Sequence, residues 1–530
     1  NKIDLPREKA VSAEAFRLDG TGAMGRTVDF LGEVFGVSGR LLGAEDEFFK
    51  TIGYRAELHA QALRQARADI LSDPSFAKAT TKEQNRAVAD RMAKIISKPP
   101  EHIRIASADA ALYSTFTNKP GKFAESILKL RESGGFLNPL HLMIPFARTP
   151  ANIARFAFER SPLAPLTKQW RDDIAAGGAR RDLALARIST GTTIMMLTAD
   201  YVDSGLVSGR GPEDSAERAA KMRTGWRPYS LHIGDKWVSY NRADPFGMTM
   251  GFAADVTEAL RRGEIDPGDM DEWNELVAAG IAAVSQVTIN KTYMSGMADF
   301  VEVMSDPERY GERYINNFAG SFIPFSSALR AVEGAVDPTR TEVNSPLDAY
   351  LEKLPGLSAR LQKRRNLWGK AIKPNSGLGV AYDTLSPVVV SKDDAEPVDA
   401  EMVALGMGVT KIRKKTTFDG VDVNLKDWPE VYDEYVRLAG NEIKHPVYGM
   451  GALDFLNSVV EGRSEFSEIY NLRTDGAEGG KASYIKDTIR KYRLLAQDAI
   501  LADDRFADFT NHLATLKTRQ KNRRRKMNIQ

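Results

Sequence analysis

Hydrophobic residues near the start of the chain recur with the period of an α-helix. Between Glu45 and Leu71 they are spaced three or four residues apart, at Phe49, Ile52, Ala56, His59, Leu63, Ala66 and Ile70. A continuous stripe of this kind is typical of an amphipathic helix that buries one face. The pattern therefore predicts a long helix, with His59 as a hydrogen-bonded core residue.

A second helical pattern follows after the break at Asp73 and Pro74. Thr81 and Gln84 have the spacing of a capping box. They precede a new apolar series made of Val88, Met92, Ile95 and Ile96. Because the next prolines are Pro99 and Pro100, we expect this helix to end before them.

One segment alternates like a β-hairpin instead. In Tyr229–Tyr240 (YSLHIGDKWVSY), Tyr229, Leu231 and Ile233 alternate with polar residues. Gly234 with Asp235 supplies a turn, and Trp237–Tyr240 forms the returning strand. Since a lone hairpin is marginally stable, its aromatic face must pack on surrounding helices.

Prolines recur from residue 338 onward and long amphipathic patterns are lacking until Trp428. This predicts an extended Pro-rich strap, with a short strand at 388–390, followed by a last helical module. We therefore expect a mainly α fold, a multi-helix bundle with one small β-hairpin near 229–240 and this strap. Its expected parts are 1–100, 101–337 (a helical core with the hairpin), 338–427 (the strap) and 428–530 (a helical module with a basic tail).

The composition indicates a folded protein and argues against metal sites built from cysteine or histidine. The 530-residue chain is 42% hydrophobic and 27% charged, which favours a folded, multi-domain protein. It has no cysteine, and no two of its six histidines have the i, i+3 or i, i+4 spacing of helical metal ligands. We expect no metal and no cofactor. Because the chain begins at Asn1, we expect it to be a processed product or part of a longer polypeptide.

Two apolar windows, 188–199 and 276–290, are shorter than the roughly 20 residues of a membrane-spanning helix. They predict buried core helices. The alternative is that both contact lipid after a rearrangement.

Candidate catalytic groups are few. The sequence at Gly479–Ser483 departs from a phosphate-binding P-loop, since Asp475 replaces the first glycine and Ala482 replaces the Ser or Thr. Asp244 and Asp255 could support a hydrolase only if a pocket brings them together. The acidic run 269–272 is typical of a solvated helix start.

Basic clusters are more informative than the net charge of +2. The first contains Lys353, Arg360, Lys363, Arg364, Arg365, Lys370 and Lys373, with Trp368 interleaved and no acid among them. The second, at the C-terminus, contains Lys517, Arg519, Lys521, Arg523, Arg524, Arg525 and Lys526. Such clusters attract nucleic acid, anionic lipid or an acidic partner protein, and equally occur as solvated tails.

Several segments resemble a known family. They are 48–66 (FFKTIGYRAELHAQALRQA), 145–165 (PFARTPANIARFAFERSPLAP), 225–255 (GWRPYSLHIGDKWVSYNRADPFGMTMGFAAD), 354–361 (LPGLSARL) and 386–406 (SPVVVSKDDAEPVDAEMVALG). Together they are similar to a bacteriophage large polyvalent protein-associated domain, found in internal virion (DNA ejection) proteins of short-tailed phages. The resemblance covers roughly residues 48–440 and includes no catalytic residue.

The resemblance implies a structural protein inside the capsid or at the portal that helps deliver DNA across the host envelope. The implied partners are further copies of the chain, the portal or other internal virion proteins, packaged double-stranded DNA and, after ejection, the host membrane. Any enzymatic module would lie outside this segment. The alternatives are a nucleic-acid-binding module of a larger phage polyprotein, a fixed portal- or tail-associated protein, or a hydrolase.

Overall fold

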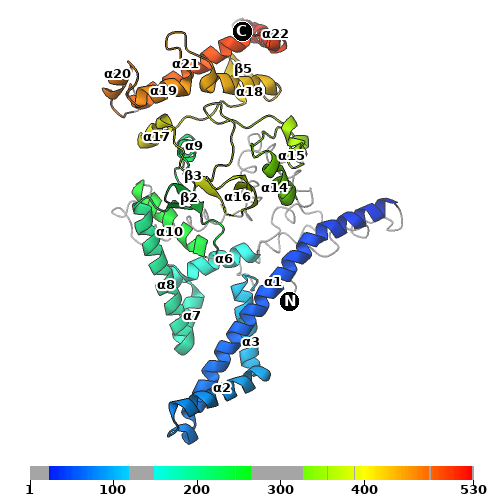
Figure 1. Ribbon diagram of the computed structural model, residues 1–530, viewed down its shortest axis with the longest axis vertical. Helices are drawn as coiled ribbons and strands as arrows, with labels where there is room; N and C mark the ends of the chain where they lie inside the picture. The colour runs from blue at the N-terminus through cyan, green and yellow to red at the C-terminus, as the bar shows by residue number, and fades with distance from the viewer. Residues whose placement is uncertain are drawn as a thin grey trace. The chain divides into compact units, whose positions relative to one another are not determined.

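The computed structural model describes residues 23–118, 148–244, 246–263, 326–354, 356–386, 388–476 and 479–527. Within these residues helices dominate and the strands form two small antiparallel sheets (Figure 1). The mainly α prediction is therefore confirmed. The chain divides into two compact units. The first contains the described residues up to Ile194 and Asp244–Thr249, and the second contains the others.

The first unit is helical. Its helices are α1 (Ala23–Ser72), α2 (Thr81–Ser97), α3 (Glu101–Ser114), α6 (Arg148–Glu159), α7 (Lys168–Ala176) and the first part of α8 (Gly178–Asp203), with short 3₁₀ turns at Pro74–Phe76 and Ala164–Leu166. Helices α2 and α3 pack beside α1 (Figure 1). Their shared core consists of Leu58, Ala62, Ala66, Ile95 and Ile103.

The buried face of α1 differs from the predicted one. Phe49 and Ile52 are 51% and 50% exposed, and His59 is exposed rather than in the core. The contact with α3 is made at small residues instead. A side chain at Gly53 would come within 2.8 Å of the Ser114 hydroxyl. The hydrophobic pattern predicted that bulky residues form the buried face of α1. Close packing against α3 instead requires small residues at the contact.

The second predicted helix is confirmed as α2, but its cap lies one residue earlier. Thr80, rather than Thr81, accepts a hydrogen bond from the Glu83 backbone N–H, and Glu83 bonds back to Thr80. The capping box therefore uses Glu83 instead of Gln84. The helix ends at Ser97, before the two prolines.

The predicted hairpin is also confirmed. It consists of β1 (Ser230–Ile233) and β2 (Lys236–Ser239), with Gly234 in the left-handed conformation at the turn. Leu231 lies opposite Val238. A third strand, β3 (Val390–Lys392), pairs antiparallel with β2, two residues later than the strand expected at 388–390. This pairing completes a three-stranded sheet in the order β1-β2-β3.

The Pro-rich segment contains short elements joined by irregular chain. These are α15 (Pro346–Leu351), a 3₁₀ turn at Ser358–Arg360, α16 (Val380–Leu385), β3, α17 (Pro397–Ala404), β4 (Lys415–Phe418) and β5 (Val421–Asn424). The β4–β5 hairpin was not predicted. Its turn residues Asp419 and Gly420 both have positive φ, as an Asp-Gly hairpin turn requires.

Other helices of the second unit surround these elements. They are α9 (Ser215–Arg223), most of α10 (Phe246–Arg261), α14 (Ser326–Val336), α18 (Pro429–Arg437) with a π-helical turn at Leu438–Glu442, α19 (Ala452–Val460), α20 (Ser467–Asn471), α21 (Lys481–Leu501), a 3₁₀ turn at Asp504–Phe506, and α22 (Ala507–Met527). The described residues from Pro429 onward are therefore mostly helical.

Two buried clusters hold the C-terminal part of this unit together. One is centred on α19 and α21 and includes Leu456 and Tyr492. The other joins the β4–β5 hairpin to α18 and α22, where the Phe418 ring lies edge-on to Tyr435 and Phe509. The ring centroids are 5.3 and 5.1 Å apart. This second cluster anchors the base of α22.

The strap docks on the C-terminal module through a backbone contact. A Cβ atom at Gly440, in the π-helical turn, would lie 2.2 Å from the Trp368 carbonyl carbon. Trp368 itself is 2% exposed, and its indole N–H donates to Asp399 at 2.8 Å. Asp399 also accepts from Arg223 at 2.7 Å. These contacts fix the chain that carries the first basic cluster.

Candidate nucleic-acid interface

Lys363, Arg364, Arg365 and Lys370 of the first basic cluster lie on two short chain segments, 362–366 and 370–372. Backbone hydrogen bonds pair these segments with each other and with 340–342. Thr341 is opposite Lys363, and Arg365 is opposite Ala371. Because successive side chains of an extended segment point to opposite sides, Lys363 and Arg365 share one side. Arg364 lies on the other.

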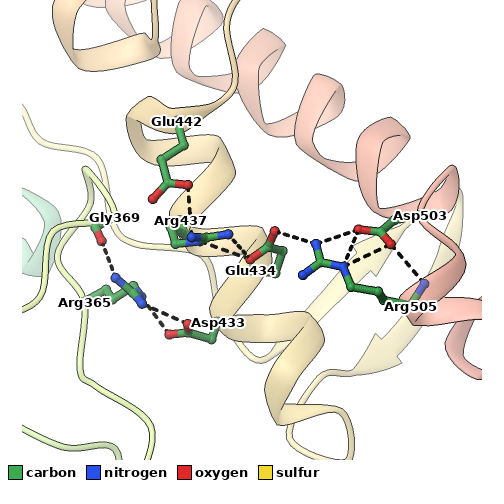
Figure 2. A network of polar contacts seen from close by, with 8 residues as sticks. All are labelled: Arg365, Gly369, Asp433, Glu434, Arg437, Glu442, Asp503 and Arg505. Carbon is green, nitrogen blue, oxygen red and sulfur yellow. Dashed lines mark hydrogen bonds and ion pairs between the residues drawn. The ribbon is translucent and has the colours of Figure 1, made fainter.

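Arg365 and Lys370 are neutralised by carboxylates. The Arg365 guanidinium donates to both Asp433 oxygens at 2.7 and 2.9 Å and to the Gly369 carbonyl at 3.0 Å (Figure 2). These bonds raise the pKa of Arg365. Lys370 pairs with Glu396 at 2.5 Å. A nucleic acid would have to displace these carboxylates to bind either residue.

The Arg365–Asp433 pair is followed along α18 by further ion pairs (Figure 2). Glu434 accepts from Arg437 at 2.6 Å and from Arg505 at 3.2 Å. Arg437 also contacts Glu442, and Arg505 contacts Asp503. The residues in this network carry four negative and three positive charges, so it joins elements of the fold rather than presenting an open basic surface.

The remaining cations of the first cluster keep solvent exposure. Arg360, Lys363, Arg364 and Lys373 are exposed. Lys363 and Lys373 lie near Asp337, and hydrogen bonds from Thr339 together with these two lysines lower its pKa. Trp368 is buried, so it provides no surface for base stacking.

The second basic cluster forms the end of α22. Leu513 is 2% exposed, but every residue from Lys517 to Asn522 is exposed. Lys517 pairs with Asp419. Arg519 and Lys521 have no carboxylate partner within the described part of the chain. The helix continues through Arg523, Arg524, Arg525 and Lys526.

Asp255, one of the two carboxylates considered for hydrolysis, is a structural group in this fold. It is 3% exposed and accepts from the Arg210 backbone N–H at 2.7 Å and the Tyr229 hydroxyl at 3.0 Å. Burial raises the pKa of Asp255 to about 7, and the charge of Glu258 adds to that rise. Asp244 belongs to the first unit, and the acidic run 269–272 lies outside the described residues.

Glu258 is a polar partner that the sequence reasoning missed. It lies one turn after Asp255 on α10 and accepts from the backbone N–H groups of Gly209 and Gly211 at 2.8 and 2.9 Å. The i, i+3 spacing placed both carboxylates on one helix face and could have indicated the pair. Together the two carboxylates bind the backbone of the 209–211 loop.

The apolar window 188–199 lies within α8. Met195 and Thr198 are buried there, whereas Met196 and Leu197 are 70% and 53% exposed, so the prediction of a buried core helix holds on one side only. The window 276–290 lies outside the described residues. Among the described residues, the model has no helix that is both long and apolar enough to span a bilayer.

The same part of the chain contains no group of three or more His, Cys, Asp or Glu residues that could hold a metal ion. Among the described side chains of the two clusters, those exposed without a carboxylate ion pair are Arg360, Lys363, Arg364, Lys373, Arg519 and Lys521. Comparison with protein-family models, curated proteins and solved structures finds no match for this chain.

Proposed function

We propose that the chain is a structural internal virion or ejection protein of a bacteriophage and contacts the packaged double-stranded DNA through the end of α22. The observation that carries the DNA contact is that the cations Lys517, Arg519 and Lys521, which follow the buried Leu513 on this helix, are exposed. The resemblance of the segments at 48–66, 145–165 and 225–255 supports the phage context. In this proposal the segment has no catalytic role.

The sequence at the end of α22 supplies no acid for ion pairs within the helix. From Lys517 to Met527 it carries seven cations and no acid, over about three turns. A helix that is polar on all sides needs a partner or many internal ion pairs. DNA supplies the missing negative charge, and its major groove, about 12 Å wide, admits a helix.

We expect DNA binding to depend steeply on salt. If five of these cations contact phosphates, log affinity for duplex DNA should fall against log salt with a slope of about 4.5. Replacing Arg523, Arg524 and Arg525 by glutamine should reduce that slope by about 2.7. Titration of a labelled duplex at several salt concentrations measures both values.

The matched control removes three exposed cations from another helix of the same unit. Lys486, Arg490 and Lys491 lie exposed on α21, and their replacement by glutamine changes the net charge equally. The proposal requires the slope of this control to stay near that of the unmodified protein. An equal loss in both variants would indicate attraction by net charge alone and would reject α22 as the contact.

In the proposed role the chain forms homo-oligomers near the portal, together with the portal or other internal virion proteins, and then passes to the host envelope. Quantitative mass spectrometry of full particles and of particles that have released their genome tests this. We expect many copies in full particles and few in emptied ones. Equal copies would favour a fixed portal or tail protein. Absence from both would reject the virion role and leave the alternative of a nucleic-acid-binding module.

A further inference from the structure

Two arginines lie directly opposite each other in the paired segments. Since Thr341 is opposite Lys363, Arg340 is opposite Arg364. The backbones of Arg340, Arg364 and Ile372 form a ring of hydrogen bonds. Arg340 donates to Ile372, Ile372 to Arg364, and Arg364 to Arg340, at 2.9, 2.8 and 2.7 Å. Opposed residues of antiparallel segments have neighbouring side chains on the same side. The backbone therefore places the side chains of Arg340 and Arg364 next to each other, and the charge of Arg364 acts on Arg340.

A third arginine lies within electrostatic range of Arg340. Arg330, on α14, contacts Glu352 at 2.6 Å. Surrounding protein lowers the pKa of Arg340, and the charges of Arg330 and Arg364 lower it further, while Glu352 opposes them. Desolvation and the charge of Arg330 likewise lower the pKa of Lys353, while Glu352 opposes them. Glu352 is thus the ion-pair partner of Arg330 and also lies within electrostatic range of Arg340.

This arrangement costs energy in the absence of an anion. Like charges directly opposite each other are destabilising. No carboxylate of the described residues forms an ion pair with Arg340 or Arg364. Planar guanidinium groups match phosphate oxygens with paired hydrogen bonds. An oxyanion with several negative charges would therefore relieve the repulsion and satisfy the donors together.

We propose that Arg330, Arg340 and Arg364 form a binding site for a phosphate group. The site goes beyond the α22 contact and does not depend on it. Two of its three residues, Arg330 and Arg340, lie outside both basic clusters of the sequence. The phosphate could belong to a small polyphosphate such as a nucleoside triphosphate or to the backbone of a nucleic acid.

The test uses the full chain, sodium triphosphate as the probe, and sodium chloride at equal ionic strength as the salt control. We expect triphosphate to raise the melting temperature and sodium chloride to leave it nearly unchanged. Arg364→Gln should weaken triphosphate binding about tenfold, measured by calorimetry. Because Arg364→Gln also removes like-charge repulsion, its melting temperature without anion should equal or exceed that of the unmodified protein. Misfolding would lower it.

Lys363→Gln is the matched control, since Lys363 is the adjacent exposed cation and points to the other side. It should bind triphosphate within about twofold of the unmodified protein. Glu352→Gln should tighten binding severalfold by removing the competing carboxylate of Arg330. The proposal fails if triphosphate has no effect beyond that of sodium chloride, or if Lys363→Gln and Arg364→Gln weaken binding equally.

A second arm identifies the source of the phosphate. In the background of the Arg523, Arg524 and Arg525 glutamine substitutions, a short DNA duplex competes with triphosphate. Displacement of triphosphate that requires Arg364 assigns the site to a nucleic-acid backbone. Triphosphate binding without competition assigns it to a small polyphosphate. Because three of the seven cations at the end of α22 are absent in this arm, failure of the α22 contact and failure of the arginine site give different results.

Discussion

Replacing Asp399 by asparagine is expected to lower the unfolding free energy of the second unit by about 3–5 kcal/mol. Asp399 is 1% exposed and accepts from Arg223 at 2.7 Å and from the Trp368 indole at 2.8 Å. Asparagine keeps an acceptor for the indole but leaves the guanidinium of Arg223, itself 11% exposed, without a counter-charge. Urea unfolding followed by tryptophan fluorescence measures the loss.

Two further variants separate the buried charge from a general loss of packing. Arg463 and Glu461 form an ion pair at the surface of the same unit, so Arg463→Ala should cost less than about 1 kcal/mol. Combining Arg223→Met with Asp399→Asn should cost less than the two single changes added together. A cost for Asp399→Asn no larger than that for Arg463→Ala would contradict the prediction.

The second large effect is a pH dependence caused by Asp255. Its pKa is about 7 in the folded protein, compared with an ordinary value of 3.8. Between these values the folded carboxyl is protonated while the unfolded one is ionised, so folding takes up a proton. Raising the pH from about 4 to above 7 should therefore lower the unfolding free energy by about 4 kcal/mol.

Asp255→Asn isolates this contribution. Its amide can accept from Arg210 and donate to the Tyr229 oxygen, which preserves both bonds without a titrating group. The difference in unfolding free energy between the two proteins, measured by urea unfolding from pH 4 to 8.5, should change across that window. The same substitution at exposed Asp498 should give a flat difference. A flat difference for Asp255→Asn would contradict the prediction.

The difference in unfolding free energy between the two proteins also cancels the contribution of acids whose pKa is lowered by folding. Burial by itself would raise the pKa of Glu342. The charges and hydrogen bonds of Lys411 and Lys414 outweigh burial and lower this pKa to about 2. The stability that Glu342 contributes is present above its ordinary value of 4.5 and is lost as the pH falls toward 2. Because Glu342 is unchanged in both proteins, its contribution cancels.

Asp255 and Asp399 show why acidic residues could not be assigned from the sequence. Both are almost completely buried. Asp399 contacts an arginine 176 residues earlier in the chain. Asp255 has a backbone N–H, a tyrosine and a second carboxylate around it. No local pattern at either position indicates its partner, because each partner is brought close only by the fold.

The packing of the strap against the rest of its unit illustrates the same limit. The series of prolines and glycines predicted an irregular segment, and the structure has short elements there. The sequence pattern could not predict that Gly440 allows the backbone at Trp368 to pack against a π-helical turn. The β4–β5 hairpin, by contrast, has a local sequence signal, the Asp419–Gly420 turn between alternating residues.

The sequence by itself determined the mainly helical class, helix α2 and the β1–β2 hairpin, because these depend on periodicity, capping and turn residues a few positions apart. It also located both basic clusters. Only the tertiary structure decided which cations are neutralised. Asp433, 68 residues from Arg365, pairs with it, whereas Arg340 lies opposite Arg364 and adds to its charge. Charge at a site is a sum over neighbours in space, and those neighbours are set by long-range packing.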